Sequence, residues 1–387
     1  MNDGSAEGAG RPLAIYVHWP FCWSKCPYCD FNSHVRESVD QARWLGAYLT
    51  ELTGYAEETV GRPIGSVFFG GGTPSLMEPR TAAAVLDRIA GLWPLAAGLE
   101  VTLEANPSTA EAERFRAFRE AGVNRLSIGV QALDDAALRF LGRGHSAAEA
   151  RAAVVLAGAV FARFSFDLIW GRPGQSETAW RQELRTAAAM AGDHLSAYQL
   201  SVEPGTAFFR DGVPGIGEDE SVGLFEATQE VLSAAGLPAY EVSNHAREGA
   251  ECRHNLAVWR GEDYLGIGPG AHGRLTCDGC TVATRAIKSP EKWLARVEQR
   301  GTGLAERVPL AAADRREELI LLGLRLTGGI ERRRFRALTG IAPEDAVDAA
   351  ALGDLVDLRL LECDEAGLRT TPAGRLRLNA VLARLLA

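Results

Sequence analysis

Short runs of β-branched and aromatic residues alternate with longer stretches of helical periodicity between residues 13 and 236. This alternation is typical of βα units around a parallel sheet. The pattern predicts strands at residues 13–18, 66–69, 99–104, 124–130, 163–169 and 194–201. It predicts helices near residues 38–60, 79–92, 109–121, 134–159, 176–191 and 218–236. We therefore expect a barrel over the first two thirds of the chain, although six strands are too few for a complete eight-stranded barrel.

Almost every predicted strand ends in a polar or glycine-rich phrase. The phrases are HWPFCWSKCPYCDF, FFGGGTPS, EANPS, GVQ, DLIWGRPGQ and QLSVEPGT. In parallel α/β folds, ligands bind at the carboxyl ends of the strands. Because these ends would converge on one mouth, we expect a ligand site there rather than a set of unrelated turns.

The remainder of the chain has a different pattern. An extended stretch, PAYEVSNHA, precedes CRHNLAVWRGEDYLGIGPGAHG, and a charged helical module begins near Ala311. The phrase LLECDEAGLRTTPAG in that module predicts a winged-helix-like domain. Its run Arg332–Arg334 is either a contact for an anionic partner or, as we favour, a solvated helix face. We divide the chain into a flexible N-terminus (1–12), the barrel (13–240), a linker with a ligand motif (241–305) and a C-terminal helical domain (306–387).

Charge and hydropathy restrict the partners and the location. The chain carries 41 Lys and Arg against 50 Asp and Glu, so it has no basic field for a nucleic-acid backbone. No apolar run precedes Leu13, and no window approaches about 18 apolar residues. We therefore expect a cytoplasmic protein without a transmembrane segment and without nucleic acid as a partner. Peripheral membrane association stays open.

Three of the seven cysteines, Cys22, Cys26 and Cys29, lie within eight consecutive residues after the first predicted strand. This spacing suits metal binding better than disulfides. Three thiolates can hold a four-iron cluster and leave one iron without a protein ligand, where chemistry can occur. Zinc with His18 or His34 as a further ligand is the alternative, but structural zinc usually needs paired arms and four ligands.

The CxxxCxxC loop, with Tyr28 directly before the third cysteine, resembles the radical SAM superfamily. The resemblance implies that S-adenosylmethionine (SAM) binds the open iron of a [4Fe-4S] cluster and is cleaved to a 5′-deoxyadenosyl radical. It also implies an α/β fold with an open, partial (β/α)6 barrel followed by a small helical domain. Tyr16, six residues before Cys22, fits the family's SAM-contacting tyrosine, and Tyr28 joins the same set.

The other strand ends supply candidate SAM contacts. Gly71, Gly72 and Thr73 resemble the superfamily's GGTP motif, and glycine lets a ligand approach the backbone closely. Two carboxylates, Glu104 in EANP and Asp167 in FDLIWG, suit the ligand's ammonium or ribose hydroxyls.

Two further polar residues complete this set. Gln131 and Arg143 can contact the ligand's polar groups, and Arg143 is a natural carboxylate clamp.

In this order along the chain, the motifs resemble the oxygen-independent coproporphyrinogen III oxidase-like family. The oxidase pattern continues CxxxCxxCxC, whereas Phe31 occupies the position of the fourth cysteine here. The oxidase also has a longer N-terminal extension than the fifteen residues before Tyr16. The phrase CPYCDFNS instead resembles the HemW branch, whose members act as heme chaperones.

A second motif supports this branch. HNLAVW resembles the branch's HNxxYW motif, with Val258 in place of the tyrosine. The resemblance implies heme contacts by His254, Asn255 and Trp259, because imidazole is the commonest axial ligand and an indole can pack on the macrocycle. The alternative is that His254 is a hydrogen-bonded structural residue.

Other cysteines and histidines leave further alternatives open. Cys252 and His272 are rival heme ligands, and Cys277 with Cys280 forms a CxxC pair that we interpret as incidental loop thiols.

We therefore expect a heme chaperone that binds heme, one [4Fe-4S] cluster and SAM, and transfers heme to acceptor proteins, with respiratory enzymes as candidate recipients. One alternative is an oxidase that decarboxylates coproporphyrinogen III through the 5′-deoxyadenosyl radical. A second is a class C radical SAM methyltransferase. No catalytic residue is assigned, and enzyme status stays open.

Overall fold

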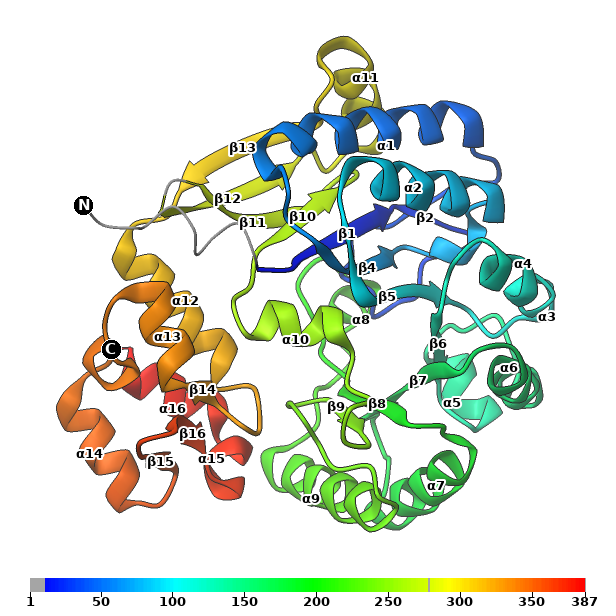
Figure 1. Cartoon of the computed structure of the whole chain (residues 1–387). Coiled ribbons are helices and arrows are strands. Elements are labelled where there is room, and N and C mark those ends of the chain that lie inside the picture. Colours follow the sequence, from blue (N-terminus) through cyan, green and yellow to red (C-terminus); the bar gives the residue numbers. More distant parts are fainter. Residues whose placement is uncertain (1–10, 278, 387) are drawn as a thin grey trace, which may run out of the picture.

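The computed structural model describes residues 11–277 and 279–386, so most of the expected flexible segment 1–12 lies outside the described residues. Within the described part, eleven strands form one sheet in the order β13-β12-β11-β10-β1-β4-β5-β6-β7-β8-β9 (Figure 1). A three-stranded sheet and a two-stranded sheet accompany it. Most helices of the first two thirds of the chain lie along the outer side of the curved main sheet (Figure 1).

The six predicted strands are confirmed as the parallel centre of this sheet. They are β1 (Leu13–Trp19), β4 (Ile64–Gly71), β5 (Leu95–Ala105), β6 (Arg125–Gln131), β7 (Arg163–Trp170) and β8 (His194–Gln199). Each pairs in parallel with the next. The helices between and after these strands are α1 (Gln41–Ala56), η1 (Glu57–Thr59), η2 (Pro74–Leu76), α2 (Pro79–Leu92), α3 (Thr109–Ala112), α4 (Phe115–Glu120), α5 (Asp135–Phe140), α6 (Ala147–Val160), α7 (Glu177–Met190), α8 (Ala207–Arg210) and α9 (Glu218–Ala234). The expected partial (β/α)6 barrel is therefore present.

The prediction of one helix over 134–159 is wrong, because α5 and α6 are separate. Gly142 adopts a left-handed backbone (φ +63°) directly after α5, which a continuing helix does not allow. Ser146 then starts α6 with a capping box to Glu149. The break between them places Arg143 in a loop at the carboxyl end of the barrel.

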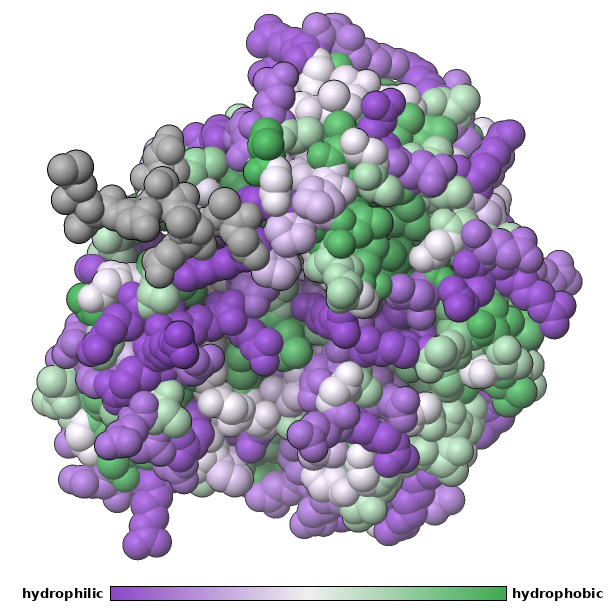
Figure 2. Space-filling model, viewed as in Figure 1, coloured by the Kyte–Doolittle hydropathy of each residue, from purple (hydrophilic) through white to green (hydrophobic). Residues whose placement is uncertain are grey.

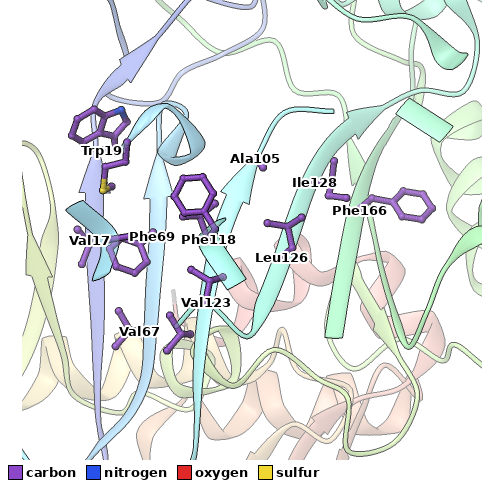
Figure 3. Packing of buried hydrophobic residues seen from close by; sticks show 14 of the residues in the cluster. Val17, Trp19, Val67, Phe69, Ala105, Phe118, Val123, Leu126, Ile128 and Phe166 are labelled. Carbon is purple, nitrogen blue, oxygen red and sulfur yellow. The ribbon is translucent and has the colours of Figure 1, made fainter. Parts of the chain in front are cut away.

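The parallel strands are apolar on their outer face and polar on their inner face. Val17, Val67 and Phe69 belong to the core under the helices, as do Leu126 and Phe166 (Figure 3). Because successive side chains of a strand point to opposite faces, the residues between them face the inside of the barrel. The inward set includes Tyr16, Ser66, Glu100, Thr102, Glu104, Ser127, Ser165 and Asp167. The hydrophobic core therefore lies between the outer face of the sheet and the helices, and the inner face of the sheet is polar.

Residues 241–305, expected as a linker, instead extend the same sheet. They form β9 (Asn244–Ala246), α10 (Arg253–Trp259), β10 (Tyr264–Ile267), β11 (His272–Cys277), β12 (Cys280–Ala286) and α11 (Pro290–Arg300), followed by β13 (Leu304–Pro309). β10 pairs in parallel with β1, and β11 to β13 continue from it as antiparallel strands. The barrel thus has additional strands on both edges.

The C-terminal domain has its own core and a three-stranded sheet in the order β14-β16-β15. Its elements are α12 (Ala312–Gly323), β14 (Ile330–Glu331), α13 (Arg332–Thr339), η3 (Pro343–Ala346), α14 (Ala349–Asp357), β15 (Leu361–Cys363), β16 (Gly367–Thr370), α15 (Pro372–Leu376) and α16 (Leu378–Leu385). Hydrophilic residues cover most of this domain in the view of Figure 2. Two arginines of the predicted solvated face are paired, Arg332 with Glu344 and Arg334 with Glu262. None of the helices in the described ranges combines the length and apolar character needed to cross a bilayer.

A buried carboxylate joins α1 to the added strands. Glu51 is 2% exposed and accepts hydrogen bonds from the backbone N–H groups of Gly268 and Gly303, both at 2.8 Å. The indole N–H of Trp293 donates to the same carboxylate at 3.1 Å. Burial raises the pKa of Glu51 to about 7.

We predict that Glu51→Ala lowers the free energy of unfolding by about 3 kcal/mol, because three buried donors lose their acceptor. Equilibrium urea unfolding measures the change. Glu57→Ala, an exposed glutamate six residues later, is the control and should change stability by no more than about 0.5 kcal/mol. Equal effects of the two substitutions would contradict the prediction.

Candidate functional site

A cavity of about 590 Å³ lies at the carboxyl ends of the parallel strands. Eleven of the residues singled out from the sequence line it: Cys22, Cys26, Tyr28, Cys29, Gly71, Gly72, Thr73, Glu104, Gln131, Arg143 and Asp167. These residues come from segments as far apart as residues 22 and 167, and the parallel sheet brings their strand ends together. The structure therefore assembles the predicted cluster and SAM residues, with the exception of Tyr16, around one space.

The cysteine loop between residues 22 and 33 is held at both of its ends. β2 (Phe21–Cys22) pairs with β3 (His34–Val35), which closes the base of the loop. The amide of Asn32 donates to the carbonyl oxygens of Pro269 and Lys288 at 2.9 and 3.0 Å. The ring of His18 contacts the backbone oxygen of Asn32 at 2.9 Å. The added strands and their connections thus anchor the loop.

Each of the three thiols has a polar neighbour. The hydroxyl of Thr73 donates to Cys22 Sγ at 3.3 Å, and Arg143 Nη1 donates to Cys26 Sγ at 3.2 Å. Cys29 Sγ lies 3.6 Å from the hydroxyl of Ser33. Hydrogen bonds and a cation at sulfur stabilise thiolates and tune a bound iron–sulfur cluster. The surroundings of the sulfurs therefore fit a cluster that three thiolates hold.

The glycine turn after β4 lies directly against this loop. Gly71 has φ +115°, and a Cβ there would stand 2.6 Å from Cε1 of His18. A Cβ on Gly72 would stand 2.7 Å from the backbone oxygen of Phe21 and 3.0 Å from Cys22 Sγ. Only glycine, which has no side chain, lets the turn lie this close to the cysteine loop, and the backbone of the turn is therefore accessible from the cavity.

A single zinc ion fits this arrangement poorly. Across the residues with defined positions, no three histidine, cysteine or carboxylate side chains converge as one metal ion requires. His34 contacts Asn32 Oδ1 at 3.2 Å, and His18 is engaged with the loop backbone. In a four-iron cluster each thiolate binds a different iron, so such convergence is not needed.

Two carboxyl groups face the cavity. Glu104 accepts a hydrogen bond from the backbone N–H of Gly71 at 3.1 Å. Burial, with the nearby charge of Asp167, raises the pKa of Glu104 to about 8, and burial raises the pKa of Asp167 to about 6. A positively charged ligand would favour the ionised forms of both groups. The cavity is therefore suited to a ligand with an ammonium or sulfonium group.

Arg143 connects the cysteine loop to two strand ends. Besides Cys26, its guanidinium donates to Asn106 Oδ1 at 2.5 Å and to the backbone oxygen of Gly129 at 2.8 Å. Gln131 adopts a left-handed backbone (φ 73°) next to an irregularity in the pairing of β6 with β7. Strain of this kind in a non-glycine residue is often found at ligand sites.

Several lining residues were not predicted from the sequence. They are Asn106, Ser127, His145, Tyr198 and Glu203, among others. Asn106 lies in the quoted phrase EANPS, and Tyr198 directly precedes QLSVEPGT, so the strand-end pattern already indicated their region. Nothing in that pattern distinguished Asn106 from its neighbours, because its role depends on contact with the distant Arg143.

Tyr16 lies below the cavity rather than in its wall. Its hydroxyl is 3.1 Å from His18 Nδ1, and its ring stacks on Phe68 with a centroid separation of 6.2 Å. The ring of His254 lies against both, 6.1 Å from Tyr16 and 5.1 Å from Phe68 between ring centroids. The structure therefore places Tyr16 beneath His18, among aromatic rings.

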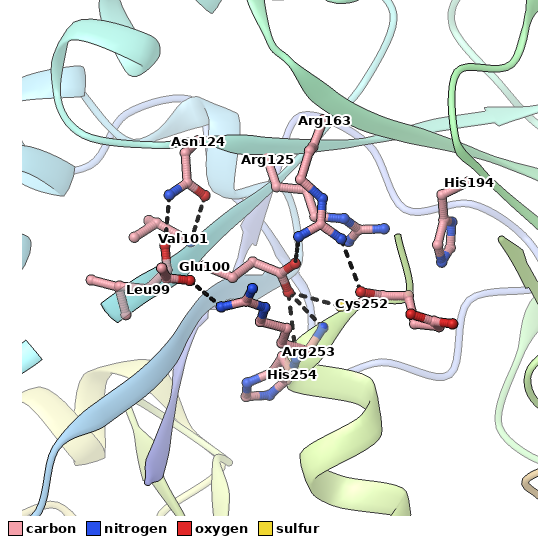
Figure 4. A network of polar contacts seen from close by, with 12 residues as sticks. Leu99, Glu100, Val101, Asn124, Arg125, Arg163, His194, Cys252, Arg253 and His254 are labelled. Carbon is pink, nitrogen blue, oxygen red and sulfur yellow. Dashed lines mark hydrogen bonds and ion pairs between the residues drawn. The ribbon is translucent and has the colours of Figure 1, made fainter. Parts of the chain in front are cut away.

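His254 is buried on the inner side of the sheet, apart from the cavity. Its Nδ1 lies 3.3 Å from the hydroxyl of Ser66, and burial lowers its pKa to about 4. At the start of α10, the carboxylate of Glu100 accepts a hydrogen bond from the backbone N–H of Arg253 at 2.8 Å. The same carboxylate forms an ion pair with Arg163 at 2.9 Å (Figure 4). This geometry favours the structural role of His254 over axial ligation.

The other candidate heme residues lie elsewhere. Trp259 lines a second cavity of about 390 Å³ between α10 and the C-terminal domain, where Arg325 stacks 4.9 Å above its ring. Asn255 lies on α10 between His254 and Trp259. Cys252 is buried beside Glu100, whereas His272 is exposed on β11. Cys277 and Cys280 face each other across the β11–β12 hairpin.

Family models, related sequences and a solved structure all match this chain, and the relatives reported below cover almost its whole length. The family model "Radical SAM superfamily" matches residues 16–187, and "HemN C-terminal domain" matches residues 310–377. The chain is 40% identical to bovine (Bos taurus) "Radical S-adenosyl methionine domain-containing protein 1, mitochondrial", over 99% of this chain and 89% of that one. It is 38% identical to "Heme chaperone HemW" of Escherichia coli, over 97% and 98% of the two chains. The solved structure of coproporphyrinogen III oxidase (HemN) from Escherichia coli has a TM-score of 0.82, 22% identity and coverage of 98% and 91%.

We predict that Arg143→Leu lowers the reduction potential of the reconstituted cluster by an amount on the order of tens of millivolts, because a cation and a hydrogen bond to sulfur are lost. Redox titration followed by electron paramagnetic resonance measures the shift. Arg139→Leu, an exposed arginine on α5, is the matched control and should leave the potential unchanged. An unchanged potential in Arg143→Leu would contradict the role of this residue.

Proposed function

This chain belongs to the radical SAM superfamily and, within it, to the family of the heme chaperone HemW, and from that premise we propose that it binds heme and transfers it to acceptor proteins. The observation that carries the proposal is the end-to-end similarity to the Escherichia coli heme chaperone. That similarity includes the barrel, the added strands and the C-terminal domain. The likeness to coproporphyrinogen III oxidase supports only the fold, because identity there is low.

Phe31 supports the chaperone over the oxidase. It occupies the position at which the oxidase pattern has a fourth cysteine, and its side chain is 60% exposed at the cavity mouth. A phenylalanine supplies apolar surface and no thiol. The substitution thus replaces a reactive group with one that suits an apolar ligand.

The chaperone would carry two resident cofactors in its cavity. Cys22, Cys26 and Cys29 would hold a [4Fe-4S] cluster, which supplies electron transfer when it is bound. Gly71, Gly72 and the carboxyl groups of Glu104 and Asp167 would hold SAM, and Glu104 would offer a negative charge to its amino group. Arg143, engaged with Cys26 and Asn106, would position the cysteine loop more than it would clamp the ligand.

The acceptors would be heme proteins, with respiratory enzymes as candidates. We further propose a cytoplasmic location with peripheral membrane contact where an acceptor is a membrane enzyme. Heme bound to this protein is cargo, so it must be released as well as held. A site at the surface meets that need better than a closed core.

The test uses the full chain with its cluster reconstituted anaerobically. Titration with heme, followed by absorbance, should show one heme per chain. Added apomyoglobin should then take up this heme from the protein. In parallel, the protein with SAM, reductant and coproporphyrinogen III should form no protoporphyrinogen. Absence of heme binding would overturn the proposal, and sustained formation of protoporphyrinogen would overturn it in favour of the oxidase.

A second prediction concerns pH and SAM affinity. Because the pKa of Glu104 is raised to about 8, its carboxyl is mostly protonated at pH 6.5 and mostly ionised at pH 8.5. A ligand ammonium binds the ionised form, so affinity should rise with pH and level off above about pH 8.

Between pH 6.5 and pH 8.5, the affinity for SAM should rise by about twentyfold more in the native chain than in Glu104→Gln, as measured by calorimetry. The variant is the proper control because the ligand's own amino group titrates in both proteins. Parallel pH profiles of the two proteins would contradict the assignment of Glu104.

A further inference from the structure

The exposed aromatic side chains gather at one end of the barrel. Among the residues that the structure describes, five aromatic side chains are at least about a third exposed: Trp23, Phe31, Phe140, Tyr198 and Phe209. Each lies at, or in a segment that follows, the carboxyl end of a parallel strand. Trp23 and Phe31 are the most exposed of the five, at 62% and 60%, and both line the main cavity.

Contacts between loops bring these segments together. The backbone N–H of Phe208 in α8 donates to the oxygen of Pro27 in the cysteine loop at 2.9 Å. The ring of Phe208 lies 4.9 Å from that of Phe140 and 6.3 Å from that of Tyr28. α8 and the end of α5 therefore lie against the loop that carries Trp23 and Phe31. We call Trp23 and Phe31, which both line the main cavity, the aromatic rim.

The rim is not used by the cofactor site. The thiols, the glycine turn, Glu104 and Asp167 lie deeper, at the strand ends, and account for the cluster and SAM. A large aromatic side chain that is exposed to water gains no free energy from burial. Several such side chains at the mouth of a cavity therefore indicate a partner with an apolar face. A flat, extended ring system is the ligand that several aromatic side chains cover best.

We propose that heme lies across the aromatic rim, with its macrocycle against Trp23 and Phe31 and one edge toward Lys25. This inference rests on the proposed function and names its binding surface. Lys25 is exposed, lines the cavity and follows Trp23 by two residues, so it offers a cation to a propionate. A heme held on a rim is accessible to an acceptor, unlike one buried beside His254.

The rival location is the smaller cavity that Trp259 lines. It is bounded by the C-terminal domain and contains Arg334, which is already paired with Glu262. Its volume of about 390 Å³ is smaller, and only one of its two lining arginines, Arg260, forms no ion pair within the described part of the chain, so the volume is the main argument against this location. Trp259 is therefore the residue whose substitution separates the two locations.

The test compares heme dissociation constants, measured by Soret absorbance titration of the reconstituted full chain. The double variant Trp23→Ser with Phe31→Ser should bind heme about tenfold more weakly or worse, because two ring contacts are lost. Val155→Ser with Leu358→Ser is the matched control, since these side chains are 71% and 67% exposed on other surfaces. It should bind heme as the native chain does.

Because Trp23 and Phe31 belong to the cysteine loop, iron content and SAM affinity are measured in the same preparations. If the double variant loses iron, the single variants Trp23→Ser and Phe31→Ser replace it, and weaker heme binding is again expected in each. Native heme affinity in rim variants that retain iron would overturn the inference and leave the proposed function intact. Weakened binding in Trp259→Ala alone would also overturn it. Failure of the native chain to bind heme would instead overturn the proposed function.

Discussion

The two-sided character of the central parallel sheet is the constraint on which the rest of this protein depends. Apolar side chains on alternate positions of each strand bind the outer helices, and this packing fixes the curvature and register of six strands. The same alternation leaves polar side chains such as Glu104 and Asp167 on the inner face. Because all six strands run in one direction, their carboxyl ends meet at one mouth, and the loops that follow them build a single cavity.

The cysteine loop depends on this frame for its shape. It contains little regular structure, and its position comes from contacts with distant residues: Asn32 with the backbone of the added strands' connections, and Cys26 with Arg143. The added strands therefore do more than widen the sheet. They hold the segment whose thiols would bind the cluster, and they leave Trp23 and Phe31 at the surface.

Local patterns were enough to predict much of the fold and of the cavity. The six strands follow from β-branched runs, and the lining residues follow from polar phrases at strand ends, since neither depends on distant contacts. The continuous helix over 134–159 was wrong because helical periodicity does not reveal a left-handed glycine, here Gly142. The motif at His254 predicts a heme contact by resemblance, whereas in the structure its ring packs against Tyr16 and Phe68, which no local pattern identifies as neighbours.

Residue types and their spacing alone indicate the α/β class, the polar phrases at the strand ends and the three thiols of the cysteine loop. These are properties of residue type and spacing, which chemistry and periodicity constrain directly. The contact of Arg143 with Cys26, the continuation of the sheet by residues 241–305 and the meeting of Trp23 with Phe31 at one cavity are visible only in the folded chain. Each of these depends on contacts between segments far apart in the chain, and such contacts arise from packing of the whole fold rather than from any local preference.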